Sequence, residues 1–293
     1  MMLDYAQLET LATILRLGSF EAAAAELGVT QSAVSQRIRV LEDRVGQPLI
    51  RRGPPCTGTE LGLRLAHHAE EVALMERGLD PALVGAATPR RVRIAVNADS
   101  LAAWIVPALA AARAALPGLL FEAVVDDQDH SADWLRRGEV TAAVTATAQP
   151  PAGCDSHPLG ALRYLATCSP AFLAEGRGTE GAPALRRMAM MTFDRKDRLQ
   201  LRWLDREAGP GPAPPTHLLP STQAFIDGAL AGLGWGMNPE PLIRSHLAEG
   251  RLVELLPGRP LDVPLFWQVS RRMAPVVAPL TRAVRDAARA ALH

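Results

Sequence analysis

The polar side chains best suited to chemistry lie within residues 29–42, on one side of a predicted helix. Thr30 is a favourable N-cap for this helix, because its hydroxyl can accept a hydrogen bond from a first-turn amide. Val34, Ile38 and Leu41 follow the i, i+4, i+7 spacing of one buried helical face. The other face carries short polar, amide and basic side chains, namely Gln31, Ser32, Ser35, Gln36, Arg37 and Arg39. Side chains of these types read base edges in a DNA major groove, so we predict a recognition helix.

The residues before this helix predict a second, shorter helix joined to it by a tight turn. Ser19 can cap a helix from Phe20 to Leu27, and Gly28 supplies the left-handed backbone that ends it. Helix, tight turn and second helix together form the helix-turn-helix arrangement. The alternative is an ordinary helical hairpin whose polar face is only solvated.

Two arginines follow the recognition helix and predict a short wing. Arg51 and Arg52 come after a turn at residues 46–48, and in a wing they would contact phosphates or enter a minor groove. The alternative is a solvated loop. The local charge agrees with DNA binding: residues 29–58 hold five arginines against two acidic residues, although the whole chain has a formal net charge of +0.

Residues 4–62 resemble the N-terminal domain of LysR-type transcriptional regulators. The resemblance rests on six pieces in one order, which are Leu8–Leu11, Gly18–Phe20, Ala23–Leu27, Gln31–Ile38, Leu41–Glu42 and Thr59–Gly62. Two positions depart from the family pattern, since Ser32 replaces a usual Pro and Gly58 a frequent Leu. The resemblance implies a winged helix-turn-helix domain over residues 1–58 and a double-stranded DNA operator as its partner, with RNA polymerase as a further candidate partner.

A long helix is predicted from its cap at Thr59 to about Val84. Apolar or small residues follow a near-heptad course along it, at Leu61, Leu65, Ala69, Val72, Leu79 and Leu83, with Glu76 as a polar break. Such a seam can pair with its copy in a second chain, so we predict self-association to a dimer or tetramer; the alternative is packing on the helix's own domain. Adjacent histidines share no helical face, so His67 and His68 are predicted to be solvated rather than to bind a metal. Residues 59–89 are assigned to this linker helix and a hinge.

From residue 90 onward, strand and helix patterns alternate, which is typical of an α/β domain with a parallel sheet. Strands are predicted at residues 92–96, 120–125, 141–145, 162–168, 188–193, 216–219 and 265–270, helices at 101–116, 130–137, 198–207, 222–230, 242–248 and 276–292, and a turn at 97–100. Two α/β lobes with two crossovers describe periplasmic binding proteins and the effector domain of LysR-type regulators, so the resemblance covers essentially the whole chain. It implies an effector-binding domain at 90–293, with lobe I at 90–162 and 267–293 and lobe II at 163–266.

In two-lobed α/β domains, a ligand lies in the crevice at the carboxyl ends of the strands. The first such end lies in residues 95–104, where the Ser100 hydroxyl and nearby amides could hold a carboxylate; the alternative is that Ser100 only caps its helix. This run is similar to the arginine- and lysine-responsive branch of the family, as are residues 136–140, 159–165, 193–194 and Trp267. The resemblance implies a basic amino acid as effector, L-lysine or L-arginine, and control of a gene for its export.

A cationic amino acid needs acidic groups for its positive charges and hydrogen-bond donors for its carboxylate. The predicted effector-binding residues are Asp99, Ser100, Leu101, Asp126, Thr145, Asp194 and Thr222. Asp127 and Asp129 are predicted to be solvated loop residues instead. Each of the other aspartates has the same alternative, a solvated or capping side chain.

Other function classes find little support in the sequence. We expect no enzyme, because no nucleophile elbow, His-Glu-x-x-His motif or phosphate loop is present. The three cysteines, Cys56, Cys154 and Cys168, are odd in number and scattered, which argues against a disulfide framework or a zinc site and fits a reducing cytoplasm. No cofactor, secretory signal or membrane span is predicted. Two alternatives stay open: a small-molecule-binding protein with no DNA role, and a replication-origin-binding protein of the same fold.

Overall fold

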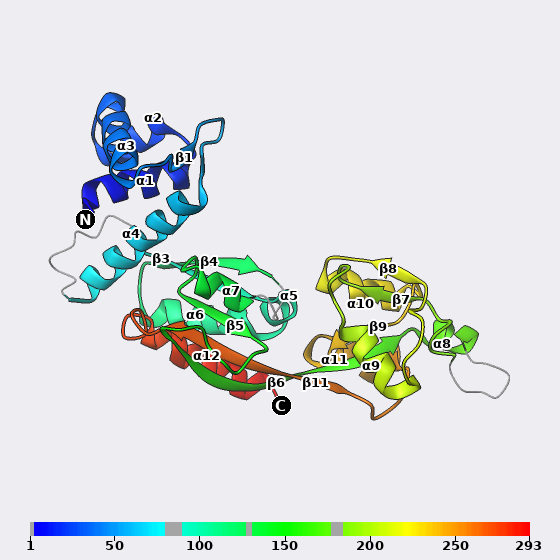
Figure 1. Cartoon of the computed structure of the whole chain (residues 1–293). Helices are drawn as coiled ribbons and strands as arrows, with labels where there is room; N and C mark the ends of the chain where they lie inside the picture. Colours follow the sequence, from blue (N-terminus) through cyan, green and yellow to red (C-terminus); the bar gives the residue numbers. More distant parts are fainter. Residues whose placement is uncertain (1–2, 80–89, 127–130, 177–183) are drawn as a thin grey trace.

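The computed structural model describes residues 3–79, 90–126, 131–176 and 184–293 of the 293-residue chain. Three parts follow one another: an N-terminal helical domain, a long helix, and two α/β lobes joined by long strands (Figure 1). Within the described ranges, no helix combines the length and apolarity needed to cross a membrane.

The N-terminal domain begins with three capped helices. They are α1 (Tyr5–Leu17), α2 (Phe20–Leu27) and α3 (Gln31–Val45). The side chains of Asp4, Ser19 and Thr30 accept hydrogen bonds from first-turn amides, which confirms the predicted caps at Ser19 and Thr30. The predicted buried face of α3 is also confirmed, because Val34, Ile38 and Leu41 lie in the core of this domain.

The predicted wing is a small antiparallel ribbon of two strands. β1 (Ile50–Arg51) pairs with β2 (Thr57–Gly58). Glu42 on α3 fixes the start of this ribbon, since its Oε1 accepts hydrogen bonds from the amides of Leu49 (2.7 Å) and Ile50 (3.3 Å). The ribbon is therefore held against α3.

The long helix α4 (Glu60–Leu79) begins after Thr59, whose hydroxyl accepts a hydrogen bond from the amide of Gly62. Leu61, Leu65 and Ala69, which were predicted to form part of a dimer seam, pack instead against the core of the N-terminal domain. The described part of the predicted dimer seam is therefore partly buried within the chain itself. This agrees with the alternative prediction, in which the helix packs on its own domain. Leu83 and the predicted helix end at Val84 lie outside the described residues, as does the side chain of Leu79.

The second half of α4 lies against lobe I. Leu74 and Met75 contact the core of that lobe, and Glu71 forms an ion pair with Arg272. His67 is half-buried and not simply solvated, so the prediction for it was wrong: its Nε2 lies 3.0 Å from Nη1 of Arg93 on the first strand of lobe I.

Lobe I is built on a mixed sheet rather than a purely parallel one. Its parallel strands are β3 (Arg90–Val96), β4 (Leu119–Val125) and β5 (Ala142–Thr145). The last strand, β11 (Leu261–Ser270), lies antiparallel to β5 because the chain returns from lobe II in the opposite direction. The helices of this lobe are α5 (Ala98–Ser100), the π-helical η1 (Leu101–Ile105), α6 (Val106–Ala115), α7 (Ser131–Arg136) and α12 (Ala278–Ala291).

Residues 97–100 do not form the predicted turn. The chain becomes helical directly after Asn97, and the amide of Leu101 donates to the Asn97 carbonyl oxygen (3.0 Å). Asn97 thus occupies the position before the first helical turn, and Ser100 lies inside the helix instead of capping it.

Two long strands connect the lobes. β6 (Cys154–Cys168) pairs with β11 from the Leu261–Tyr164 partners to the Ser270–Cys154 partners, so both strands run side by side from one lobe to the other (Figure 1). The strand predicted at 162–168 therefore begins earlier, at Cys154. In lobe II, β9 (Gly236–Pro239) and β10 (Val253–Glu254) extend the same sheet along β6.

Lobe II places its helices around a short parallel pair of strands. The pair is β7 (Met190–Thr192) and β8 (Thr216–Leu218), and the helices are α8 (Pro170–Gly176), α9 (Leu199–Ala208), α10 (Thr222–Leu230) and α11 (Glu240–Ala248). Ser221 caps α10, because its hydroxyl accepts a hydrogen bond from the amide of Ala224. Trp203 and Trp235 are fully buried with ring centroids 5.4 Å apart, which anchors α9 to the lobe.

Candidate functional site

The polar face of α3 is open to solvent. Gln31, Ser32, Gln36 and Arg39 are exposed and Ser35 is half-buried, so their side chains can reach a partner surface. Because α3 follows α2 after a tight turn, this face has the geometry of a recognition helix in a major groove.

Arg37 differs from the other predicted DNA-binding residues. It is half-buried, and its Nη1 donates a hydrogen bond to the Thr10 hydroxyl on α1 (3.3 Å). This contact holds α3 against α1, so Arg37 lies at the edge of the exposed face rather than at its centre.

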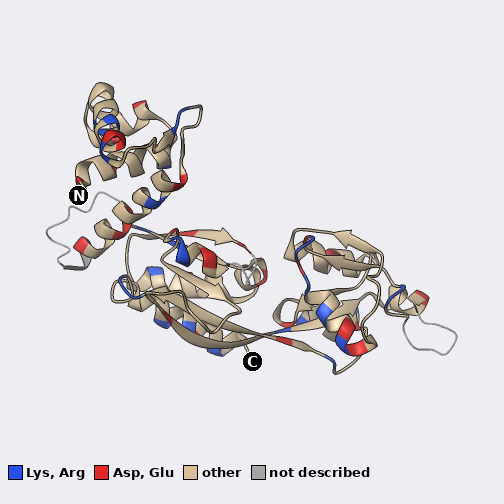
Figure 2. Cartoon of the chain, in the orientation of Figure 1, with Lys and Arg blue, Asp and Glu red and all other residues tan. Residues whose placement is uncertain are grey.

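Basic residues lie on α3, at the end of β1 and in the loop that joins β1 to β2 (Figure 2). Arg51 and Arg52 are both exposed, and the guanidinium of Arg52 lies 5.4 Å from the centre of the Phe20 ring. A cation–π contact restrains the long Arg52 side chain without removing its charge. The arrangement can therefore present two positive charges beside the recognition helix.

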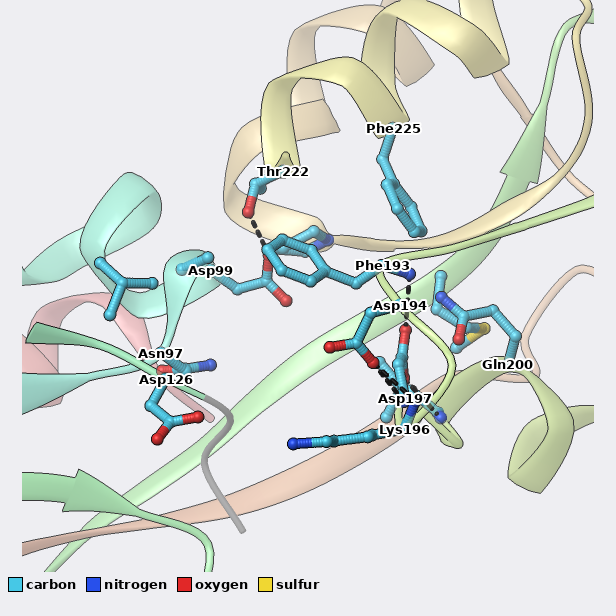
Figure 3. A pocket seen from close by; sticks show the side chains of 15 residues that line it. Asn97, Asp99, Asp126, Phe193, Asp194, Lys196, Asp197, Gln200, Thr222 and Phe225 are labelled. Atoms are coloured by element: carbon cyan, nitrogen blue, oxygen red, sulfur yellow. Dashed lines mark hydrogen bonds between the residues drawn. The ribbon is translucent and has the colours of Figure 1, made fainter. Parts of the chain in front are cut away.

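A second candidate site is a cavity of about 240 Å³ between the two lobes. Lobe I lines it with the start of α5 and the end of β4, and lobe II lines it with the loop after β7, the helices α9 and α10, and β9 (Figure 3). The lining residues are Asn97, Ala98, Asp99, Val125, Asp126, Phe193, Asp194, Lys196, Asp197, Leu199, Gln200, Thr222, Phe225, Met237 and Pro239.

Asp99 joins three parts of the molecule at this cavity. Its Oδ1 accepts a hydrogen bond from the Thr222 hydroxyl of α10 (2.6 Å), and its Oδ2 accepts one from the Tyr164 hydroxyl of β6 (2.8 Å). Figure 3 shows the Thr222 side chain directed at Asp99 from the opposite lobe. The cavity is therefore closed on this side by a carboxylate with two hydroxyl donors.

The remaining carboxylates of the cavity have different partners. Asp126 accepts a hydrogen bond from the indole Nε1 of Trp134 (2.8 Å). Asp194 Oδ1 accepts from the amides of Lys196 (2.7 Å) and Asp197 (3.0 Å), so it also shapes its own loop. Each of these carboxylates therefore has at least one hydrogen-bond donor from its own lobe.

Three of the predicted effector-binding residues do not line the cavity. Ser100 and Leu101 continue the helix that begins at Ala98, which turns them away, and the Ser100 hydroxyl is fully buried. Thr145 is also buried, and its hydroxyl donates to the Thr147 carbonyl oxygen (3.0 Å). The cavity brings together the other four predicted residues, Asp99, Asp126, Asp194 and Thr222.

Asp197 and Gln200 are lining residues that the sequence patterns did not single out. Asp197 Oδ2 accepts hydrogen bonds from the Thr192 hydroxyl (3.0 Å) and the Phe193 amide (3.1 Å), and this fixes the loop that carries Asp194. The sequence offered one signal for Asp197. This aspartate lies two residues before the start of α9 and shortly after the predicted strand end at residue 193.

The cavity is electrostatically negative. Among its described lining residues, four carboxylates face one basic group, Lys196. A low-dielectric cavity strengthens the attraction of such a set for a cation. In the parts of the chain that the structure describes, no group of three or more His, Cys, Asp and Glu side chains is arranged to hold a metal ion.

Comparison with known families assigns both parts of the chain. Residues 5–63 match the model for bacterial regulatory helix-turn-helix proteins of the LysR family, and residues 85–292 match the LysR substrate binding domain. The first match disfavours a binding protein without a DNA role.

Relatives match over nearly the full length. The HTH-type transcriptional regulator ArgP of Pseudomonas aeruginosa is 44% identical over 283 residues, which cover 95% of this chain and 93% of the relative. The crystal structure of ArgP from Mycobacterium tuberculosis matches with a TM-score of 0.80 and 39% identity, over 100% of this chain and 99% of that one. Full-length LysG from Corynebacterium glutamicum with bound effector Arg matches with a TM-score of 0.70 and 35% identity. The match covers 99% of this chain and 100% of that one. The chain therefore belongs to the LysR family of bacterial regulatory helix-turn-helix proteins.

Proposed function

We propose that this chain is a transcriptional regulator that binds an operator through α3 and the wing and responds to a cationic amino acid, L-arginine or L-lysine. The observation that carries the choice of ligand is the carboxylate-rich cavity between the lobes. The similar LysG structure with bound Arg supports the same choice. Pockets for small ligands usually measure about 300–1,000 Å³. A cavity of about 240 Å³, just below this range, suits a single amino acid.

The lining residues divide into two sets by charge. Asp99 and Asp126 of lobe I and Asp194 of lobe II would hold the α-ammonium and the side-chain cation, and the Thr222 hydroxyl would help to orient Asp99. The ligand carboxylate would face Lys196 and the amides at the start of the helix at Ala98, where the helix dipole favours an anion. A ligand with contacts in both lobes would favour one arrangement of the lobes over another.

On DNA, Gln31, Ser32, Ser35 and Gln36 would contact bases, while Arg39, Arg51 and Arg52 would contact phosphates. Arg37 would act mainly by holding α3 in place through Thr10. A dimer or tetramer would place two such helices in successive major grooves. The proposed parts are residues 1–58 for DNA, 59–89 for the linker and hinge, and 90–293 for the effector.

The regulated gene that best fits this ligand is an exporter of the basic amino acid. The proposal involves no catalysis and no cofactor. RNA polymerase is a further proposed partner, and the cytoplasm is where operator, polymerase and metabolite would meet.

A thermal-shift panel of the twenty amino acids tests the ligand. A ligand that binds only the folded state raises the melting temperature by mass action. Arginine or lysine should stabilise the chain, whereas citrulline, which has the shape of arginine without its charge, should not. Stabilisation by none of the twenty would contradict the proposed effector.

Gel shifts on the DNA upstream of a neighbouring exporter gene test the DNA partner. A specific complex that weakens as the salt concentration rises is expected. Equal affinity for random DNA at physiological salt would contradict an operator-binding role.

A further inference from the structure

A continuous series of contacts connects the cavity to the linker helix. Asp126 lines the cavity and accepts a hydrogen bond from Trp134 Nε1 on α7 (2.8 Å). The guanidinium of Arg93 on β3 lies 5.5 Å from the centre of the Trp134 ring. Nη1 of the same arginine lies 3.0 Å from Nε2 of His67 on α4. Three contacts thus span the distance between a ligand-facing carboxylate and the helix that carries the DNA-binding domain.

Trp134 and Arg93 are each held by further contacts. A movement of one of them is therefore passed on to the next residue in the series. Trp134 lies against a second guanidinium, that of Arg137, at 4.8 Å. Arg93 also contacts the Glu122 carboxylate (2.9 Å) and donates to the Glu139 carbonyl oxygen (3.2 Å). Packed polar groups of this kind have a small number of discrete arrangements.

His67 lies on a helix that is shared by two domains. Leu61 and Leu65, on the first half of α4, pack into the core of the N-terminal domain. Beyond His67, Leu74 packs against lobe I, and Glu71 pairs with Arg272. A change in the contact between His67 and lobe I therefore changes the position of the DNA-binding domain, which is attached to the same helix.

We propose that the Asp126–Trp134–Arg93–His67 series couples the cavity to the DNA-binding domain. This inference rests on the proposed function, because it takes the cavity as the effector site. A ligand cation at Asp126 would share the carboxylate that holds the Trp134 indole. The resulting change in Trp134 would alter the position of Arg93 and thereby its contact with α4.

The chemistry of His67 fits this role. An arginine nitrogen can only donate, so Nε2 of His67 must accept and the imidazole must be neutral. Burial lowers the pKa of His67, and the positive charge of Arg93 lowers it further, against smaller opposite effects of Glu122 and Glu139. Glu70, Glu71 and Arg91 line the same interface.

The test measures the coupling itself. The DNA affinity of the full chain is compared with and without L-arginine or L-lysine, whichever stabilises the wild type, on a fragment that the wild type selects from random DNA. The ratio of the two affinities is the coupling factor, and thermodynamic linkage requires DNA to change the amino-acid affinity by the same factor.

Four variants separate coupling from folding and binding. His67→Leu removes the acceptor, and His67→Gln restores one. Trp134→Phe removes the indole N–H and keeps a smaller aromatic ring. His68→Leu is the matched control, because the neighbouring histidine is also half-buried but makes no contact in this series.

We expect His67→Leu and Trp134→Phe each to reduce the coupling factor about fivefold. His67→Leu should keep the amino-acid affinity without DNA, and the DNA affinity without amino acid, within about twofold of the wild type. His67→Gln should recover most of the coupling, and His68→Leu should retain it. The double variant His67→Leu/Trp134→Phe should lose no more than the larger single loss, because both residues belong to one series.

Several results would overturn the proposal. Wild-type coupling in His67→Leu would do so, as would equal losses in His67→Leu and His68→Leu, or losses that multiply in the double variant. In each of these cases the wild type still responds, so the proposed function survives. If DNA affinity in the wild type does not respond to either amino acid, the proposed function fails and this inference fails with it.

Discussion

The hydroxyl of Thr222, at the first residue of α10, donates a hydrogen bond of 2.6 Å to Asp99 at the start of the helix in the opposite lobe. The two residues are 123 positions apart in the sequence. Their contact joins the lobes directly across the cavity, while Tyr164 holds the other carboxylate oxygen from a connecting strand. A ligand cation at Asp99 would therefore meet a carboxylate that is already oriented by both lobes.

Replacement of Asp99 by Asn should weaken binding of L-arginine more than about tenfold, because a hydrogen bond to a charged group contributes roughly 1.5–3 kcal/mol. Isothermal titration calorimetry measures the change. Asp227→Asn is the matched control, since this aspartate of α10 is exposed and lies outside the cavity. Equal arginine affinity in Asp99→Asn and Asp227→Asn would contradict a role for Asp99 in ligand binding.

The triple variant Gln31→Ala, Ser35→Ala, Gln36→Ala should lose DNA affinity by much more than tenfold, since each good base contact contributes about 1–3 kcal/mol. The helix fold should persist, because these side chains lie outside the core. Fluorescence anisotropy with operator and random DNA measures both affinity and specificity. Gln47→Ala, an exposed change outside α3, should leave both unchanged; an unaffected triple variant would assign the recognition surface elsewhere.

Gly62→Ala should destabilise the N-terminal domain by about 1–3 kcal/mol, the usual cost of an extra methyl group in a packed site. A Cβ at this position would lie 2.9 Å from the carbonyl carbon of Leu49, and a backbone atom has little freedom to move away. Thermal unfolding measures the effect. In the matched control Gly53→Ala, the new Cβ would meet only the Pro55 carbonyl oxygen, at 3.8 Å, and stability should hold.

Acid should weaken the contact between α4 and lobe I through His67. Because burial, and then Arg93, lower the pKa of this histidine below 6.5, the unfolded chain takes up its proton first as the pH falls. The stabilising contribution is therefore complete above pH 6.5 and declines below it. The melting temperature of the wild type should fall relative to that of His67→Gln between about pH 7.5 and 5.5. Parallel curves for the two proteins would argue against a neutral His67 in contact with Arg93.

The three cysteines should differ sharply toward thiol reagents. Burial raises the pKa of Cys168 to about 12 and also raises the pKa of Cys154, so few reactive thiolates form at either residue. Cys56 lies half-exposed in the loop that joins β1 to β2. Maleimide treatment of the native chain followed by mass spectrometry should show one rapid label, on Cys56, and three only after denaturation. Rapid labelling of Cys168 would contradict the burial of this strand.

The helix-turn-helix part could be predicted from sequence almost residue by residue. Ser19 and Thr30 each cap a helix whose amides lie three residues away, and Gly28 ends α2 where a left-handed backbone is needed. Signals of this kind work because donor and acceptor lie within one helical turn, so neighbouring residues alone fix the contact. The alternation of strands and helices also predicted most of the elements in both lobes, but not α8 or β10.

The cavity was only partly predictable, since long-range pairing decides which strand ends meet. Asp126 was identified because it directly follows a strand of lobe I, and Asp99 because it lies three residues after another. Ser100 and Thr145 also lie at or near strand ends. The helix begins earlier than predicted, at Ala98, which turns Ser100 away from the cavity, and Thr145 is buried in lobe I.

The sequence by itself thus determined the family, the recognition helix and the acidic character of the strand ends, all of which depend on local patterns. Only the tertiary structure decided that Thr222 reaches Asp99, that Trp134 holds Asp126, and that His67 meets Arg93 rather than solvent. These contacts depend on how separate elements pack, and that packing is set by the whole core rather than by the residues that touch.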